Sequence, residues 1–147
     1  MRLSKLKAAE QQLDVACRLF IAGESVLAVH TLSGAAEEIL GKLAERASEL
    51  SMFQRMQAAA QEHLQRSLSV KEMSRLVNTS RNDLKHAKDP NELSFSYNPD
   101  HAVVMLFRAM VNYQLATGSL TPTMEQAFLV LRERYPMFLP PSDRPGT

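Results

Sequence analysis

The chain has 147 residues, of which 45% are apolar and 22% are charged, and its formal net charge is +1. This length suits one domain with a single hydrophobic core, and the composition excludes a disordered or fibrous protein. A charge so close to zero also excludes a global positive field that would draw the protein to nucleic acid or to an anionic membrane. Any contact with RNA must therefore be local.

The cysteine content and the N-terminus bear on the cellular compartment. Cys17 is the only cysteine and lies in an apolar helical pattern, which is typical of a small core residue. One cysteine can form neither an internal disulfide nor a CxxC metal site. Residues 1–10 lack the apolar run of a signal peptide, and no stretch approaches the roughly 18 apolar residues that span a bilayer. We expect a cytoplasmic protein that makes no membrane contact.

The first two predicted helices cover residues 5–22, ended by Gly23, and residues 25–49, because their apolar residues recur every three or four positions. The second helix also has an unusual face, on which four residues superpose at 100° per residue: His30, Gly34, Glu37 and Gly41. Each glycine costs roughly 1 kcal/mol relative to alanine inside a helix. The pair suggests that another helix or a ligand comes very close, so we expect this helix to be buried on two sides.

A third helix is predicted over residues 51–68, and a fourth begins at Ser69, which has the spacing of a capping box with Glu72. The polar residues 78–80 interrupt the fourth helix. Ser80, followed by an aspartate three positions later, gives a second cap signal. The sequence therefore predicts a new helix start that carries residues 81–87.

The remaining chain gives two more helices and a tail. Residues 93–97 alternate as an extended segment would, but with no visible partner strand we expect no sheet. Asn98 with Pro99 begins a fifth helix that Gly118 ends, and Thr121 starts a sixth that runs to about residue 135. Short connections favour an all-α, up-and-down helical bundle of about five to six helices. We expect one domain over residues 1–136 and a proline-rich tail over residues 137–147.

The residues best suited to chemistry are Arg81 and His86. Arg81 offers a planar fork of donors that matches phosphate oxygens, and His86 can exchange protons near neutrality. RNA supplies its own nucleophile in the 2′-OH, so cleavage without a metal ion needs only a general acid or base, a stabilising charge and correct positioning. Five positions apart on a helix, the two side chains point about 140° apart. We therefore expect two copies to pool their Arg and His side chains in one cleft at a dimer interface.

Arg81 and Asn82, followed by three residues and His86, resemble the signature motif of the HEPN superfamily. Three strings carry a longer likeness to a bacterial group of HEPN-like proteins, which spans about residues 26–128: TLSGAAEEILGK from Thr31, RNDLKHAKDP from Arg81 and TPTMEQAF from Thr121. Many members of the superfamily are ribonucleases of toxin and defence systems, and their motif occupies a dimer cleft. The resemblance implies a HEPN-like bundle that is a homodimer and binds RNA or a nucleotide.

On this reading the chain is a metal-independent endoribonuclease that needs no cofactor. Arg81 holds the scissile phosphate, His86 acts as general acid or base, and Asn82 positions them. The long glycine-marked helix faces the same cleft with His30 and Glu37, which we assign to binding. Lys85 would raise the local positive potential and is assigned to binding as well.

Three alternatives remain open at this stage. In a structural reading, Arg81 pairs with a carboxylate such as Glu37, and His86 caps the end of its own helix. In a metal-site reading, His30, Glu37, Glu38 and His86 bind a metal ion, although they lack the paired Glu-x-x-His spacing usual in bundles. In the third, the chain is a non-catalytic adaptor or antitoxin-like bundle that binds a cognate protein.

Overall fold

The computed structural model describes the chain except for residues 48–49, 65–69, 88, 137–140, 144–145 and 147. The described part contains six α-helices and a short 3-10 helix, and no strand. The bounds are α1 Lys5–Ala22, α2 Val26–Arg46, α3 Met52–Leu64, α4 Val70–Lys85, α5 Asp100–Thr117, α6 Pro122–Arg134 and the 3-10 helix Pro141–Asp143. The predicted all-α helical bundle is confirmed. In the described part of the chain, no helix is long and apolar enough to cross a membrane.

Local cap signals set the helix ends much as predicted. Gly23 and Gly118 adopt left-handed φ values of 70° and 88° and end α1 and α5. The hydroxyls of Ser25 and Thr121 accept hydrogen bonds from backbone N–H groups three residues ahead and so begin α2 and α6. These caps place the short turns that fold the helices back on one another.

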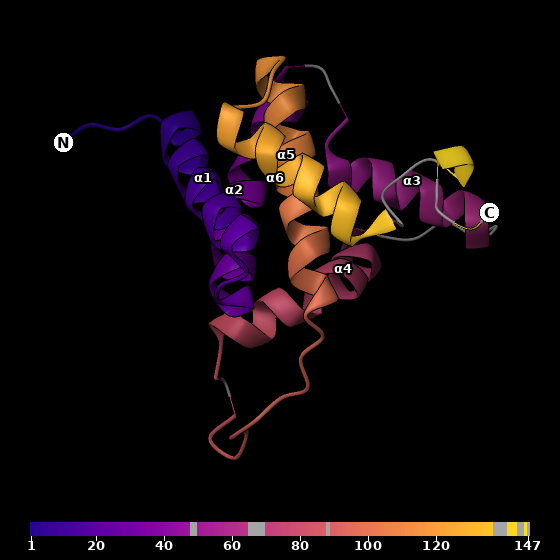
Figure 1. Ribbon diagram of the computed structural model, residues 1–147. Coiled ribbons are helices and arrows are strands. Elements are labelled where there is room, and N and C mark those ends of the chain that lie inside the picture. The colour runs from indigo at the N-terminus through magenta and orange to yellow at the C-terminus, as the bar shows by residue number, and fades with distance from the viewer. Residues whose placement is uncertain (48–49, 65–69, 88, 137–140, 144–145, 147) are drawn as a thin grey trace.

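Helices α2 and α5 form the centre of the bundle. α2 packs against α5 and against α1, and α6 packs on α1 (Figure 1). The buried residues of α2 come from both its apolar and its polar face: Val29, His30, Ser33, Gly34, Ala36, Glu37, Leu40 and Ala44. The expectation that this helix is buried on two sides is confirmed. α5 buries two polar residues, Arg108 and Asn112, among its apolar ones.

The predicted break at residues 78–80 is wrong, because α4 continues through them to Lys85. The side chains that suggested a cap make other bonds. Thr79 Oγ1 donates to the backbone carbonyl one turn earlier in α4, and Ser80 Oγ is hydrogen-bonded to Nδ1 of His101 on α5. A polar stretch that satisfies itself within and across helices need not end one.

This correction moves the Arg81 motif from a helix start to a helix end. Arg81 lies in the last part of α4, and His86 follows its final residue. The positive end of the helix dipole, which favours anions, lies at the opposite end of α4 and so adds nothing at Arg81. The predicted cap at Ser69 lies outside the described residues.

Three parts lie away from the central helices. α3 extends to one side of the bundle, and the segment between α4 and α5 projects below it (Figure 1). We call residues 89–97 of this segment the arm; as expected, they form no strand. Of the predicted tail, residues 137–140, 144–145 and 147 lie outside the described part, and the 3-10 helix Pro141–Asp143 interrupts what was expected to be free of helix.

Candidate functional site

A buried ion pair joins α2 to α5. Arg108 Nη2 donates to Glu37 Oε1 at 2.8 Å, and the two side chains are only 1% and 7% exposed. Asn112 Nδ2 donates to the same oxygen at 3.5 Å, and Arg108 Nη1 donates to Asn78 Oδ1 at 3.4 Å. Burial lowers the pKa of Arg108 from its ordinary value, and the negative charge of Glu37 opposes this effect. Removing one partner would leave an uncompensated buried charge, so the pair ties the central helices together.

The structural alternative expected Glu37 to pair with Arg81, and this expectation is wrong. Glu37 does not orient His86 either. Its carboxylate is already engaged by Arg108 and Asn112. The carboxylate near Arg81 is instead the next residue, Glu38. Adjacent residues on a helix point 100° apart, so α4 meets the Glu38 side of α2 and α5 meets the Glu37 side.

Arg81 lies across Gly34 of α2. Arg81 Nη1 donates to the backbone carbonyl of Gly34 at 3.4 Å and lies 3.5 Å from Glu38 Oε2. A β-carbon at position 34 would lie 2.6 Å from Arg81 Cδ, which is closer than real β-carbons approach. The predicted close approach is confirmed at Gly34. At Gly41 a β-carbon would meet Asn112 Nδ2 at an ordinary 3.5 Å.

Arg81 lines a surface hollow of about 160 Å³, together with residues of α2, α3 and α5. Six of the charged side chains that line it form three ion pairs: Arg108 with Glu37, Arg81 with Glu38, and Lys42 with Glu45. The Arg81 pair is long, and Glu38 is 65% exposed. A pair with one exposed partner contributes at most about 1 kcal/mol, so Glu38 holds Arg81 only weakly, and the Arg81 side chain itself is only 14% exposed.

The rest of the motif lies on the last turn of α4 and just beyond it. Asn82, Lys85 and His86 are all exposed, and the backbone N–H of His86 donates to the carbonyl of Asn82 at 3.1 Å. None of the three belongs to the described lining of the Arg81 hollow. Within one chain, Arg81 and Glu37 thus share a pocket, whereas Asn82, Lys85 and His86 lie outside it.

His30 lies in the interior, where it supports the arm. Its Nδ1 is 2.8 Å from the Tyr97 hydroxyl, and only 1% of the residue is exposed. Burial, with the positive charges of His101, Arg81 and Arg108, lowers the pKa of His30 to about 4. The imidazole is therefore neutral at pH 7. His30 does not belong to the described lining of the Arg81 hollow.

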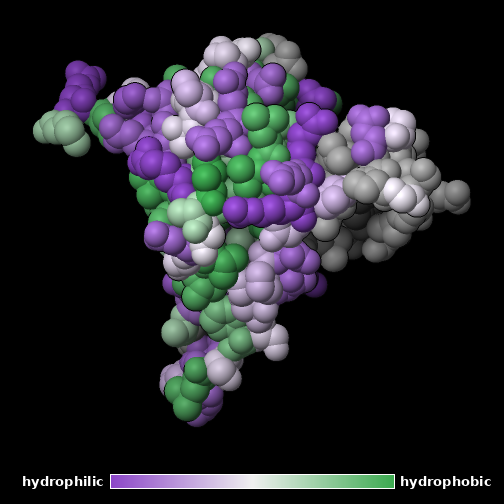
Figure 2. All heavy atoms as spheres, in the orientation of Figure 1, coloured by the Kyte–Doolittle hydropathy of each residue, from purple (hydrophilic) through white to green (hydrophobic). Residues whose placement is uncertain are grey.

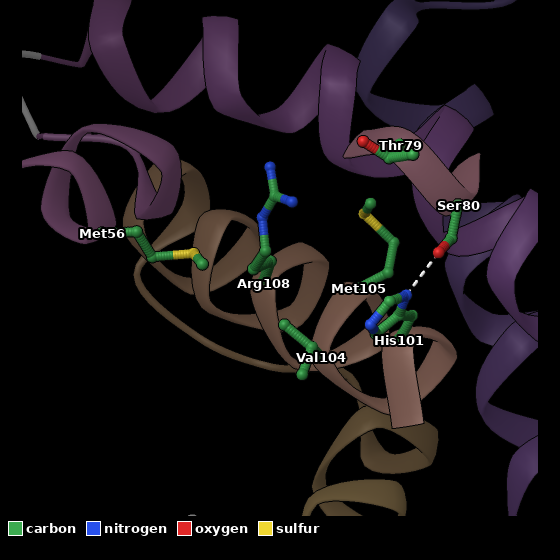
Figure 3. A pocket seen from close by; sticks show the side chains of 7 residues that line it. All are labelled: Met56, Thr79, Ser80, His101, Val104, Met105 and Arg108. Carbon is green, nitrogen blue, oxygen red and sulfur yellow. Dashed lines mark hydrogen bonds between the residues drawn. The ribbon is translucent and has the colours of Figure 1, made fainter. Parts of the chain in front are cut away.

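A second hollow, of about 210 Å³, lies between α3, α4 and α5 and also reaches Arg108. In Figure 3 the Arg108 side chain stands between Met56 on one side and Met105 on the other, and the hydrogen-bonded Ser80 and His101 lie beyond Met105. Arg108 thus lines both hollows, and its ion-pair partner Glu37 lines the Arg81 hollow. Mixed apolar and polar walls of this kind are typical of ligand pockets. Neither Arg108 nor His101 was among the residues predicted for the site.

A signal for Arg108 was present in the sequence. Arg108 and Asn112 stand four positions apart and so share one face of an otherwise apolar helix. Buried polar residues need hydrogen-bonding partners. The glycine-marked face of the second helix, which carries Glu37, could supply such a partner. The Ser80 and His101 contact had no such signal, because it depends on how α4 crosses α5.

The residues considered as metal ligands are not brought together. In the part of the chain that the structure describes, no group of three or more His, Cys, Asp or Glu side chains could hold a metal ion. His30 is engaged by Tyr97 and Glu37 by Arg108, which leaves neither ring nor carboxylate turned toward a shared centre.

Fold and site together define an all-α bundle with a buried Arg–Glu pair at its centre and an Arg side chain in a surface hollow beside it. A scan against models of protein families, a search of curated proteins and a search of solved structures each found no match.

Proposed function

We propose that this protein binds RNA phosphates and cuts RNA without a metal ion, through Arg81 and His86 of two paired copies. The observation that carries the proposal is the position of Arg81, whose guanidinium lines a surface hollow beside the exposed Glu38 carboxylate. A phosphate can accept two parallel hydrogen bonds from a guanidinium, which is stronger and more specific than one contact of 3.5 Å to Glu38.

Two copies are needed because one chain separates the two groups. His86 is exposed beyond the end of α4, outside the described lining of the Arg81 hollow. A twofold axis near this end of α4 would bring His86 of one copy to Arg81 of the other. The resemblance of the Arg81 motif to that of HEPN ribonucleases, which lies in a dimer cleft, supports the same arrangement.

The chemistry uses the 2′-OH of RNA as the nucleophile. His86 takes the proton of the 2′-OH as general base or gives one to the departing 5′-oxygen as general acid. The P–O2′ bond forms as the P–O5′ bond breaks, and Arg81 stabilises the charge that builds on the phosphorane oxygens. Asn82 positions the phosphate and Lys85 adds positive potential. The products are a 2′,3′-cyclic phosphate and a 5′-hydroxyl.

The test is cleavage of single-stranded RNA in EDTA by the purified chain and by its Arg81→Ala and His86→Ala variants. Each substitution should lower the rate roughly 100-fold or more, since each removes a transition-state interaction. Arg18→Ala, an exposed arginine on α1, is the control and should leave the rate unchanged. A 2′-deoxy strand should bind and remain intact. Cleavage that survives both Arg81→Ala and His86→Ala, or that cuts the deoxy strand, would overturn the proposal.

A non-catalytic adaptor that binds a cognate protein is the second candidate. The three ion pairs in the Arg81 hollow and the net charge of +1 favour it, because tight RNA binding depends on many unpaired cations. Fluorescence anisotropy with labelled RNA separates the two candidates. If the protein is a ribonuclease, Arg81→Ala should lower its affinity for RNA and Arg18→Ala should not. If it is an adaptor, its affinity for RNA should be weak, and the two substitutions should reduce it equally.

A further inference from the structure

The arm presents an exposed leucine directly after a preformed turn. The backbone N–H of Glu92 donates to the carbonyl of Asp89 at 3.0 Å, and the N–H of Asn91 donates to the Asp89 carboxylate at 2.8 Å. Leu93 follows this turn and is 93% exposed, and Phe95 is 43% exposed. Figures 1 and 2 show the segment projecting from the body of the bundle. The tip therefore combines two acidic residues with an apolar side chain that its own chain barely covers.

The far end of the arm is fixed to the bundle. The Tyr97 hydroxyl is hydrogen-bonded to the buried His30 of α2, and the Phe95 ring packs edge-on against the Tyr97 ring with centroids 6.3 Å apart. These contacts lower the entropy cost of presenting the tip to a partner.

A groove of opposite charge lies between α1, α2 and the end of α4. It encloses about 380 Å³ and has an apolar floor from α2: Ala35, Ile39 and Leu43. Among the described residues that line it, Glu38 is the one carboxylate and four are cations: Lys5, Lys42, Arg46 and Lys85. From position 35 to position 46 the groove follows about 16 Å of α2, at 1.5 Å per residue.

We infer that the groove binds the arm of a second copy of this chain. The apolar floor suits Leu93, and the cationic rim suits Asp89 and Glu92, so the tip and the groove are complementary in both polarity and charge. Lys42 is already paired with Glu45 at 3.2 Å, which leaves Lys5, Arg46 and Lys85 to meet the acidic turn. A second copy carries the arm by necessity, whereas any other partner would have to supply an equivalent acidic, leucine-tipped loop.

The arm and the groove are neighbours in the chain, and this favours a reciprocal exchange. Lys85 lines the groove, and the arm begins four residues later. Two copies related by a twofold axis can therefore place each arm in the other's groove, with both His86 residues close to the axis. The inference deepens the proposed function, which requires a second copy, but it is measured without RNA.

Sedimentation equilibrium of the full chain tests the inference. The wild-type chain should associate to twice its 16.5 kDa mass, and Leu93→Asp should weaken the dimer at least tenfold, as for a central apolar contact. Leu129→Asp is the matched control, since Leu129 is 64% exposed on α6, far along the chain from arm and groove, and it should leave the association unchanged. Circular dichroism of each variant establishes that it is folded.

Reversing charges on the arm and in the groove tests directly whether the arm binds in the groove. Glu92→Lys and Arg46→Glu should each weaken the dimer. A one-to-one mixture of the two variants should restore association between unlike chains, because both contacts of a mixed pair then join opposite charges: one arm and groove are unchanged, and the other arm and groove have both been reversed. A monomer at every concentration overturns the inference and leaves the groove to another occupant. So does a dimer that Leu93→Asp and Leu129→Asp affect equally. A dimer that behaves as described but cuts no RNA would overturn only the proposed function.

Discussion

Arg81 of α4 occupies the space that a side chain at Gly34 of α2 would need. Its Nη1 donates to the Gly34 carbonyl at 3.4 Å, and its Cδ lies 2.6 Å from where a β-carbon would stand. A glycine in a helix interior costs roughly 1 kcal/mol relative to alanine. In return, the absence of a side chain at Gly34 lets α4 cross α2 closely enough for Arg81 to line the hollow.

Gly34→Ala and Gly41→Ala should therefore have different effects. At Gly41 the added methyl meets only an ordinary contact, so the free energy of unfolding should rise by up to about 1 kcal/mol. At Gly34 the methyl must push Arg81 aside, so the stability gain should be lost and RNA cleavage should fall about tenfold or more. Urea denaturation and the cleavage assay measure the two effects. If both variants gain stability and keep full activity, the Gly34 contact has no role.

The carboxylates of Glu37 and Glu38 should differ sharply in their contribution to stability. Glu37→Gln takes the carboxylate charge away from the buried Arg108 and should lower the free energy of unfolding by about 3 kcal/mol. Glu38→Gln removes only a long ion pair whose carboxylate is exposed and should cost about 1 kcal/mol or less. Chemical denaturation at pH 7 compares the two. Equal losses of unfolding free energy in the two variants would mean that the Glu37–Arg108 pair does not stabilise the contact between the central helices.

His30 should make the protein less stable in mild acid. The pKa of His30 is about 4 in the folded chain against an ordinary value of 6.5. Between these values the unfolded chain binds a proton here that the folded chain does not, so the free energy of unfolding falls as pH falls from 6.5 to 4, by up to about 3 kcal/mol. His30→Gln should flatten this part of the stability curve. An unchanged slope in the variant would contradict the burial of a neutral His30.

Cys17 should report unfolding rather than surface chemistry. Burial raises the pKa of the Cys17 thiol from 9.0 to about 12, so the thiolate is roughly a thousandfold scarcer than for a free thiol at pH 8. Disulfide-exchange reagents should react with the native chain only as fast as it opens, and rapidly in urea. Fast labelling of the native chain would place Cys17 at the surface instead.

The sequence predicted those parts of the fold that depend on local chemistry. The spacing of apolar residues and the caps at Gly23, Gly118 and Thr121 gave α1, α5 and α6 nearly as observed, because a cap bonds within its own turn. The same local rule failed at residues 78–80. There the polar side chains of α4 bond to its own carbonyls and to His101 of α5, a partner that spacing alone does not reveal.

The candidate site was only partly predictable for the same reason. The glycine-marked face correctly indicated that another element approaches α2, but not that Arg108 would take Glu37 and leave Glu38 to Arg81. Helical periodicity tells which residues share a face and not which helix lies opposite. Arg108 was not predicted, because a charged residue is almost never fully buried unless it is paired, and the sequence does not reveal the pairing with Glu37.

The most direct test of the account is complementation between two inactive variants. Arg81→Ala and His86→Ala chains, each inactive alone, are mixed, dissociated and allowed to pair again. If Arg81 of one copy acts with His86 of the other, half of the dimers are mixed and each has one intact site of two, so about a quarter of the wild-type cleavage rate should return. If the mixture remains as inactive as either variant while sedimentation shows that the chains have paired, the two residues do not form a shared site.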